Sequence, residues 1–214
     1  MKIIITGTTG MVGEGVLLEC LQDPKVTEIL SISRKSNGIT NPKLKELLLP
    51  DFTKIEEYKN QLSDYDACFF CAGISSVGMK EEKYRQITYD TTMAVAKTLV
   101  EVNPNMVFTY VSGASTDSTE KGSVMWARVK GKTENDLMKF PFRRVVNFRP
   151  GAMLPFPGQT NAKQLYKIIA KAFTFFMPKK IIALSELGQA MIHSVERDNV
   201  KSILEIVDIK ELAK

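Results

Sequence analysis

The chain has 214 residues, of which 44% are hydrophobic and 25% are charged, proportions that exclude a disordered chain, a collagen and a coiled coil. Its 29 basic and 24 acidic side chains give a net charge of +5, and no apolar run approaches the roughly 20 residues that span a bilayer. Residues 1–5 lead directly into a glycine-rich turn, which leaves no room for a signal peptide, and three cysteines are too few for a disulfide framework, so we expect a cytoplasmic protein.

Apolar, β-rich runs alternate with helical patterns along the chain, which is typical of a parallel sheet covered by helices on both faces. The runs predict strands at residues 2–5, 28–33, 46–49, 67–71, 106–112, 144–148 and 202–207. Helices are predicted at residues 11–21, 54–62, 81–102, 123–139, 162–176 and 185–197. We therefore expect an α/β, Rossmann-like, doubly wound parallel sheet. The chain is predicted to form a single domain, 1–214, in which residues 1–155 bind the cofactor and residues 156–214 form a small C-terminal part on the substrate side.

A glycine-rich turn follows the first predicted strand and precedes the first predicted helix. Its sequence is Thr6-Gly7-Thr8-Thr9-Gly10-Met11-Val12-Gly13. Gly7 would permit the tight turn, Gly10 would let the backbone approach a pyrophosphate, and Gly13 would let the helix pack close to the strand. The unpaired N–H groups of the helix N-terminus would then point at the anion, so the turn predicts a dinucleotide site.

A basic pair, Arg34-Lys35, ends the second predicted strand, 21 residues after Gly13. An acidic residue at this point accepts hydrogen bonds from the ribose 2′-hydroxyl of NAD, whereas a basic residue accommodates a 2′-phosphate. The planar guanidinium of Arg34 suits a phosphate and Lys35 adds a second charge. The pair therefore predicts NADP as the cofactor in preference to NAD.

Further motifs follow in a fixed order: Asp51-Phe52, Cys71-Ala72-Gly73, Ser112, Val129-Lys130-Gly131-Lys132-Thr133-Glu134 and Arg149-Pro150-Gly151. With the glycine turn and the basic pair, they make residues 2–155 resemble the short-chain dehydrogenase/reductase superfamily. The chain looks most like its atypical short members, which are related to the NAD(P)-dependent epimerase/dehydratases.

The resemblance implies roles for these residues. Asp51 would contact the adenine amino group, with Phe52 beside the ring, and Cys71-Ala72-Gly73 would line the adenosine ribose. Pro150-Gly151 would reach the nicotinamide. Ser112 would hold the substrate carbonyl, and Lys130 would bond the nicotinamide ribose. These roles imply an NADP(H)-dependent oxidoreductase or epimerase-like enzyme that acts on a small carbonyl compound.

The chain departs from the family at the catalytic tyrosine. The family motif places a tyrosine four residues before the lysine, where the lysine charge lowers the pKa of the phenol and makes it a proton donor. Here Trp126 stands four residues before Lys130, and an indole N–H has no acid/base equilibrium near neutral pH.

Three interpretations of Trp126 remain open. In the first, catalysis is lost, which leaves a non-catalytic NADP-dependent regulatory or binding protein. In the second, another group, from Tyr84, Tyr89, Ser115 or a water, supplies the proton instead. In the third, the reaction needs no such relay, as in hydride transfer to an activated alkene.

The positive charge is concentrated in residues 137–185, which carry nine basic residues and no acidic one. This segment favours an anionic small-molecule substrate, a membrane surface or a solvated face, and no nucleic-acid motif accompanies it. Its predicted helix at residues 162–176 places three lysines opposite an apolar side. We expect that helix to cover the substrate cleft or a homodimer partner, with a membrane surface as the less favoured alternative.

Two potential metal or redox sites are interpreted as structural. Cys68 and Cys71 form a C-x-x-C within a buried strand, whereas a redox pair lies at a helix N-terminus, so we expect buried thiols. His193 is the sole histidine and has no ligand partner at a suitable spacing, so no metal site is predicted.

Overall fold

The computed structural model describes residues 1–161 and 181–214. Seven parallel strands form the main sheet, in the order β3-β2-β1-β4-β5-β6-β9. The strands are β1 (Lys2–Thr6), β2 (Glu28–Ser33), β3 (Leu44–Leu48), β4 (Ala67–Phe70), β5 (Val107–Val111), β6 (Arg144–Arg149) and β9 (Ile203–Glu205). The predicted α/β, Rossmann-like fold is confirmed, because the order reverses direction at β1 as in doubly wound sheets.

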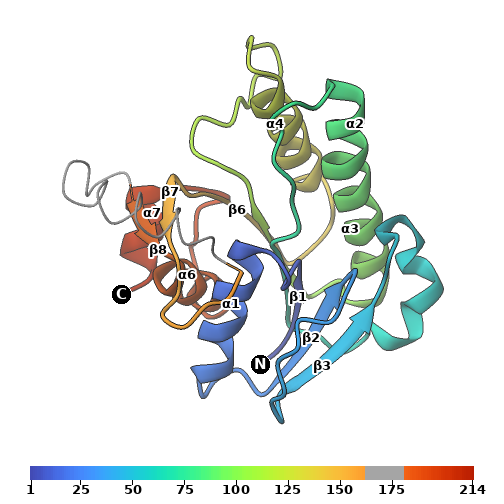
Figure 1. Cartoon of the computed structure of the whole chain (residues 1–214), viewed down its shortest axis with the longest axis vertical. Helices are drawn as coiled ribbons and strands as arrows, with labels where there is room; N and C mark the ends of the chain where they lie inside the picture. The colour runs from blue at the N-terminus through green and yellow to red at the C-terminus, as the bar shows by residue number, and fades with distance from the viewer. Residues whose placement is uncertain (162–180) are drawn as a thin grey trace.

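Helices cover both faces of the sheet (Figure 1). One face carries α1 (Met11–Gln22), α6 (Leu184–Glu196) and α7 (Ile206–Leu212). The other face carries η1 (Phe52–Gln61), α2 (Glu81–Arg85), η2 (Gln86–Asp90), α3 (Thr91–Val102) and α4 (Met125–Leu137). Since both faces are covered, the central strands are almost continuously apolar and buried, as in the Lys2–Thr6 strand, where only the first residue is exposed.

The C-terminal elements join this same arrangement. Strand β9 pairs with β6, and α6 packs directly on α1. The two helices approach closely at two glycines. A Cβ added to Gly15 would lie 2.6 Å from a methyl carbon of Leu184, and one added to Gly188 would lie 2.7 Å from the Cβ of Glu19. The α1–α6 contact therefore fastens the C-terminal residues to the helix that follows the glycine turn.

Several elements differ from the sequence prediction. The segment predicted as a helix at residues 54–62 is a 3-10 helix, η1. The long helix predicted at 81–102 contains one π-helical stretch, η2, between α2 and α3. A two-stranded parallel sheet, β7 (Ala152–Leu154) with β8 (Ile181–Ala183), was not predicted, because three-residue strands carry no readable alternation. The helix predicted at 162–176 lies outside the described residues, and none of the described helices is long and apolar enough to cross a membrane.

Candidate functional site

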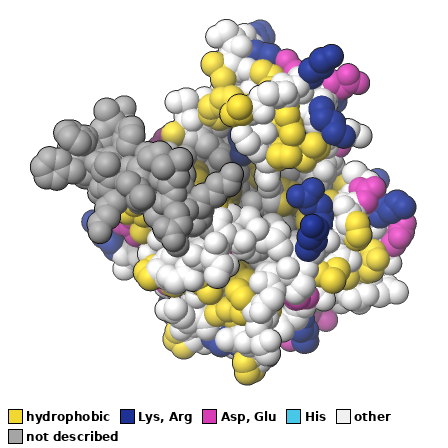
Figure 2. All heavy atoms as spheres, in the orientation of Figure 1, with side chains coloured by type: hydrophobic (Ala, Val, Ile, Leu, Met, Phe, Trp, Pro, Cys, Tyr) yellow, Lys and Arg dark blue, Asp and Glu magenta, His cyan; other side chains and the backbone are white. Residues whose placement is uncertain are grey.

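A cleft of about 720 Å³ opens where the strands of the main sheet end. The residues that line it follow the carboxyl ends of β1, β2, β3, β4 and β5, with others from α2, η2, α3, α4 and β7. Strand β1 lies between β2 and β4, so the cleft occupies the topological switch point at which doubly wound sheets bind ligands. Figure 2 shows a hollow in this face of the molecule with Lys and Arg side chains beside it.

The glycine turn forms one wall of the cleft, and its glycines are required for different reasons. Gly7 has a φ of +74°, and an added Cβ would lie 2.7 Å from the Cα of Ala72. At Gly13, an added Cβ would lie only 2.2 Å from the carbonyl oxygen of Gly7. At Gly10 the nearest atom would be 3.4 Å away, so this glycine has space on its Cβ side. Gly7 and Gly13 therefore shape the turn, whereas Gly10 leaves room beside it.

Two threonines hold the turn against its neighbours. The buried Oγ1 of Thr8 is hydrogen-bonded to the hydroxyls of Ser31 at 2.7 Å and Ser33 at 3.0 Å, both in β2. The Oγ1 of Thr6 accepts hydrogen bonds from the backbone N–H groups of Cys71 and Ala72, at the end of β4. These bonds explain why serines occupy a buried strand, and they fix the turn relative to two strand ends.

The N-terminus of α1 faces the cleft without a side-chain cap. Its N-cap residue is Gly10, which has no side chain, and Met11 and Val12 of the first turn line the cleft together with Thr9. Backbone N–H groups in the first turn of a helix lack intrahelical partners and attract anions. The residues present therefore fit a bound pyrophosphate.

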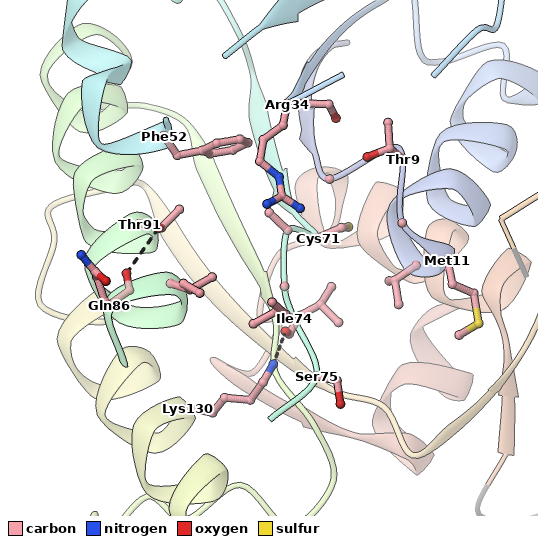
Figure 3. Close-up of a pocket in the computed structure, with 18 of the residues that line it drawn as sticks. Thr9, Met11, Arg34, Phe52, Cys71, Ile74, Ser75, Gln86, Thr91 and Lys130 are labelled. Carbon is pink, nitrogen blue, oxygen red and sulfur yellow. Dashed lines mark hydrogen bonds between the residues drawn. The ribbon is translucent and has the colours of Figure 1, made fainter. Parts of the chain in front are cut away.

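One end of the cleft is formed by Arg34, Asp51, Phe52 and Thr53. Figure 3 shows the guanidinium of Arg34 and the ring of Phe52 directed toward the same region. The carboxylate of Asp51 accepts hydrogen bonds from the Thr53 hydroxyl at 2.6 Å and the Thr53 N–H at 3.0 Å, and these bonds lower the pKa of Asp51. Lys35 is exposed and does not line the cleft.

Ser112 and Lys130 lie at the other end of the cleft. Ser112 is buried, and its hydroxyl is 2.8 Å from that of Thr116, which donates its single proton to the carbonyl oxygen of Gly113 at 2.8 Å. The Ser112 hydroxyl is therefore the donor toward Thr116, and its lone pairs are left for a ligand. The resemblance implies that Ser112 holds the substrate carbonyl, and that role stays a prediction.

The amine of Lys130 is bound by backbone at the end of β5. Its Nζ, at the end of the side chain labelled in Figure 3, donates to the carbonyl oxygens of Val111 at 3.0 Å and Ser112 at 3.2 Å. It also lies 5.3 Å from the centre of the Tyr110 ring. Burial lowers the pKa of Lys130 to about 8, although the charge of Glu134 acts in the opposite direction. An ammonium group has three donors, so one N–H remains for a ligand.

Helix α4, which carries Lys130, is fixed by two tertiary contacts. A Cβ added to Gly131 would lie 1.8 Å from the carbonyl oxygen of Asp117, so only glycine fits there. Glu134 is fully buried and accepts hydrogen bonds from Arg149 in β6, with 3.0 Å between Nε and Oε1. The predicted motif residues Gly131, Glu134 and Arg149 therefore hold the helix against the sheet and the loop after β5.

Some predicted site residues lie away from the described lining of the cleft. Gly13 is beneath the turn, and Pro150 is buried with its carbonyl oxygen accepting from Ala114. Gly151 also does not line the cleft. Trp126 is half-buried, and its ring lies against Gly113, where an added Cβ would be 3.5 Å from Cζ3. The spacing of Trp126 and Lys130 had suggested that both face the ligand, whereas of these two only Lys130 is among the described lining residues.

Sequence reasoning missed part of the lining. The missed residues are Ser33, Pro50, Thr53, Ile74, Ser75, Lys83, Gln86, Ile87, Thr91, Val111 and Met153. Gln86 and Ile87 belong to the π-helical stretch η2, and the Thr91 hydroxyl donates to the Gln86 carbonyl across that wider turn. π-turns occur often at functional sites, but no residue pattern within a helix predicts where they form.

Cys68 and Cys71 pack among apolar side chains, and the His193 ring lies against a backbone carbonyl oxygen. Cys68 and Cys71 pack into the cores on opposite faces of the sheet, and burial raises the pKa of Cys71 to about 12. Cys71 also lines the cleft as a neutral thiol. The Nδ1 of His193 lies 2.7 Å from the Leu212 carbonyl oxygen, between α6 and α7. Across the described ranges, no three metal-ligating side chains come together.

Comparison with known proteins gives one family match and several relatives. Residues 3–123 match the sequence profile of the NAD dependent epimerase/dehydratase family, which is more than half of the chain. "Protein fmp52, mitochondrial" of Emericella nidulans is 25% identical over 179 residues, 80% of this chain and 74% of that protein. "Protein FMP52, mitochondrial" of Candida albicans is 28% identical over 158 residues, 72% of this chain and 68% of that protein.

A solved structure shares the fold. The structure described as "MoeE5 in complex with UDP-glucuronic acid and NAD" has a TM-score of 0.73 and 15% identity, and the match covers 96% of this chain and 76% of that chain. The names of the two curated relatives also bear on location. Both are named as mitochondrial proteins, and this finding contradicts the expectation of a cytoplasmic protein.

Proposed function

Because the chain belongs to the NAD dependent epimerase/dehydratase family, we propose that it binds NADP(H) in the cleft and acts as an oxidoreductase or epimerase-like enzyme on a small carbonyl substrate. The observation that carries this proposal is the distribution of residues along one cleft. The glycine turn forms a wall, Arg34 and Phe52 lie at one end, and Lys130 lies at the other, where its amine is bonded to Ser112. A dinucleotide bound along this wall would have its adenosine at the first end and its nicotinamide at the second.

The charges of the cleft support a phosphorylated cofactor. Arg34, Lys83 and Lys130 line it, and Asp51 is the one acidic side chain in its described lining. The position that would bind a ribose 2′-hydroxyl through a carboxylate carries Arg34 instead. The guanidinium has five donors in a planar fork, so it would bind a 2′-phosphate with two hydrogen bonds.

When bound, the nicotinamide would supply or accept a hydride, and this chain's residues would orient the other reactant. The lone pairs of Ser112 would accept a hydrogen bond from a substrate hydroxyl. The third N–H of Lys130 would donate to an oxygen of the cofactor ribose or of the substrate. These two groups, on neighbouring elements, favour an alcohol–carbonyl interconversion.

A non-catalytic NADP-dependent regulatory or binding protein is the second candidate. Trp126 at the tyrosine position favours it, because an indole cannot exchange the proton that the family's tyrosine exchanges. Both candidates require NADP(H) to bind, and they differ in whether a carbonyl compound is turned over.

Calorimetric titration with NADPH and NADH tests the shared part of the proposal. We expect NADPH to bind about 10- to 100-fold more tightly than NADH, because a hydrogen bond to a charged group contributes about 1.5–3 kcal/mol. Arg34→Ala should remove most of that difference and leave NADH affinity nearly unchanged. Lys35→Ala, at the exposed neighbouring position, is the matched control and should have a smaller effect. Equal affinities of the wild-type protein for the two cofactors would contradict the assignment of NADP.

A further inference from the structure

Reduction of a carbonyl group needs a proton donor as well as a hydride, because the oxygen gains negative charge as the carbon is reduced. The tyrosine that gives this proton in the family is replaced by Trp126, whose ring lies against Gly113. The hydroxyl of Ser112 uses its proton on Thr116. The site therefore needs another donor if it is to catalyse such a reaction.

Three other hydroxyl groups suggested by the sequence do not reach the described lining of the cleft. Tyr84 is buried in α2, and burial raises the pKa of its phenol. The hydroxyl of Tyr89 donates to Asp136 of α4 at 2.6 Å, and Tyr89 is not among the residues that line the cleft. Ser115 lies in the loop after β5 with a φ of +68° and is also outside the lining. None of these three hydroxyls is therefore placed to meet a reacting oxygen.

We propose that Lys130 itself is the proton donor, and that it acts directly on the reacting oxygen instead of through an aromatic hydroxyl. This inference rests on the proposed function. Two of the three N–H bonds of the Lys130 ammonium are used by the carbonyl oxygens of Val111 and Ser112. These two bonds hold Nζ at the end of the cleft opposite Arg34 and Phe52. The third N–H of Lys130 is the donor left for a ligand. The neighbouring Ser112 hydroxyl offers lone pairs.

The chemical step balances with the groups named. In the reducing direction, the Lys130 ammonium would give one proton to the carbonyl oxygen, while the carbonyl carbon would gain the hydride that a bound reduced cofactor supplies. The C=O double bond would become a C–O–H single bond, its new electron pair would come from that cofactor, and the amine would be left neutral. Solvent then returns a proton to the amine through the open cleft. In the oxidising direction, the neutral amine takes the proton from the alcohol.

The groups around the amine set its charge state near neutral pH. Glu134, on the same helix as Lys130, favours the charged form of the Lys130 amine. The Glu134 carboxylate is also paired with Arg149 of β6. The Lys130 amine also lies over the ring of Tyr110, from β5. Burial raises the pKa of the Tyr110 phenol and keeps this phenol neutral. Lys83 of α2 lines the same cleft as a second cation.

The net result of these surroundings is favourable for proton transfer. Burial outweighs the charge of Glu134 and lowers the pKa of Lys130 to about 8. A general acid is most effective when its pKa lies near the working pH. Reduction should therefore proceed below about pH 8 and decline above it, whereas oxidation should increase as pH rises through that range.

Chemical labelling of the cofactor-free protein tests the amine without any substrate. The rate at which an acylating reagent modifies each lysine, followed by mass spectrometry against pH, reports when that amine becomes neutral. Lys130 should show a midpoint near pH 8. Lys132, two residues later, is the internal control, because its ion pair with Asp136 raises its pKa. A midpoint for Lys130 near about 10.4, the ordinary lysine value, would overturn the proposal.

The variant Lys130→Arg tests the proton transfer, because a guanidinium keeps the charge and the donors but does not release a proton. NADPH affinity should stay within about threefold, while reduction of a panel of aldehydes and ketones should fall by about 10²- to 10⁴-fold. Lys132→Arg, the same change outside the cleft, should leave both unchanged.

The outcomes separate this proposal from the function on which it rests. Retained reduction by Lys130→Arg would overturn the role of Lys130. The same conclusion would follow if the wild-type protein bound NADPH and reduced no compound of the panel. Failure of the wild-type protein to bind NADPH would overturn the proposed function as well.

Discussion

The amine of Lys130 donates a hydrogen bond to the backbone carbonyl oxygen of Ser112 over 3.2 Å, so α4 is bonded to the end of β5 at the cleft. The side chains of these two residues have complementary capacities. Ser112 offers lone pairs because its proton is given to Thr116, and Lys130 offers an N–H. An alcohol between them could donate to Ser112 and accept from Lys130, and a carbonyl oxygen could accept from Lys130, so a proton could be exchanged without a tyrosine.

Gly13→Ala should destabilise the protein because the new methyl would overlap the carbonyl oxygen of Gly7, 2.2 Å away. Overpacking of this kind costs about 1–3 kcal/mol, and the turn should also lose affinity for the cofactor. Gly10→Ala is the matched control for stability, since the nearest atom to its new methyl, the carbonyl oxygen of Gly7, would be 3.4 Å away. Urea denaturation of the two cofactor-free variants measures the difference. Equal losses would show that Gly13 does not limit the packing of α1 on β1.

Glu134→Gln should be strongly destabilising because it removes the charge that faces the guanidinium of Arg149 in a buried environment. Removing one partner of a buried ion pair costs about 3–5 kcal/mol. Glu196→Gln breaks the exposed ion pair with Lys25 and should cost under about 1 kcal/mol. Guanidinium denaturation curves of both variants give the comparison. A loss for Glu134→Gln as small as that for Glu196→Gln would rule out a structural role for the buried pair.

Glu14 makes folding stability depend on pH in the acid range. Burial disfavours its charge, but hydrogen bonds from the Thr160 hydroxyl and from the N–H groups of Thr160 and Asn161 outweigh burial and lower the pKa. A lowered pKa in the folded state adds stability above the unfolded value of about 4.3, and that stability is lost as pH falls through the folded value.

The variant Glu14→Gln should therefore be less stable than the wild-type protein at pH 7, and the difference should shrink as the solution is acidified below about pH 4.3. Thermal unfolding of the two proteins between neutral and acid pH measures this convergence. A constant difference across the range would mean that the charge of Glu14 does not contribute, and that only its shape or neutral hydrogen bonds matter.

Much of the cleft wall that the glycine turn forms could be predicted from sequence because its parts are contiguous. Gly7 and Gly13 belong to one strand–turn–helix unit, and their backbone requirements follow from local geometry. Arg34 follows the next strand, and parallel strands place their carboxyl ends at one edge. The lining from η2 could not be predicted in the same way, because a π-turn depends on how the helix packs, and Gln86 and Ile87 read as ordinary helical residues.

The sequence by itself determined that Trp126 and Lys130 lie one turn apart on a helix, since four residues make about one turn. Only the tertiary structure decided that Lys130 lines the cleft while the Trp126 ring lies against Gly113. The reason is that residue spacing sets relative positions on a helix but leaves its rotation and its position along the sheet free. Here the tight fit of Gly131 on the loop after β5, with the buried contact between α4 and β6, sets both.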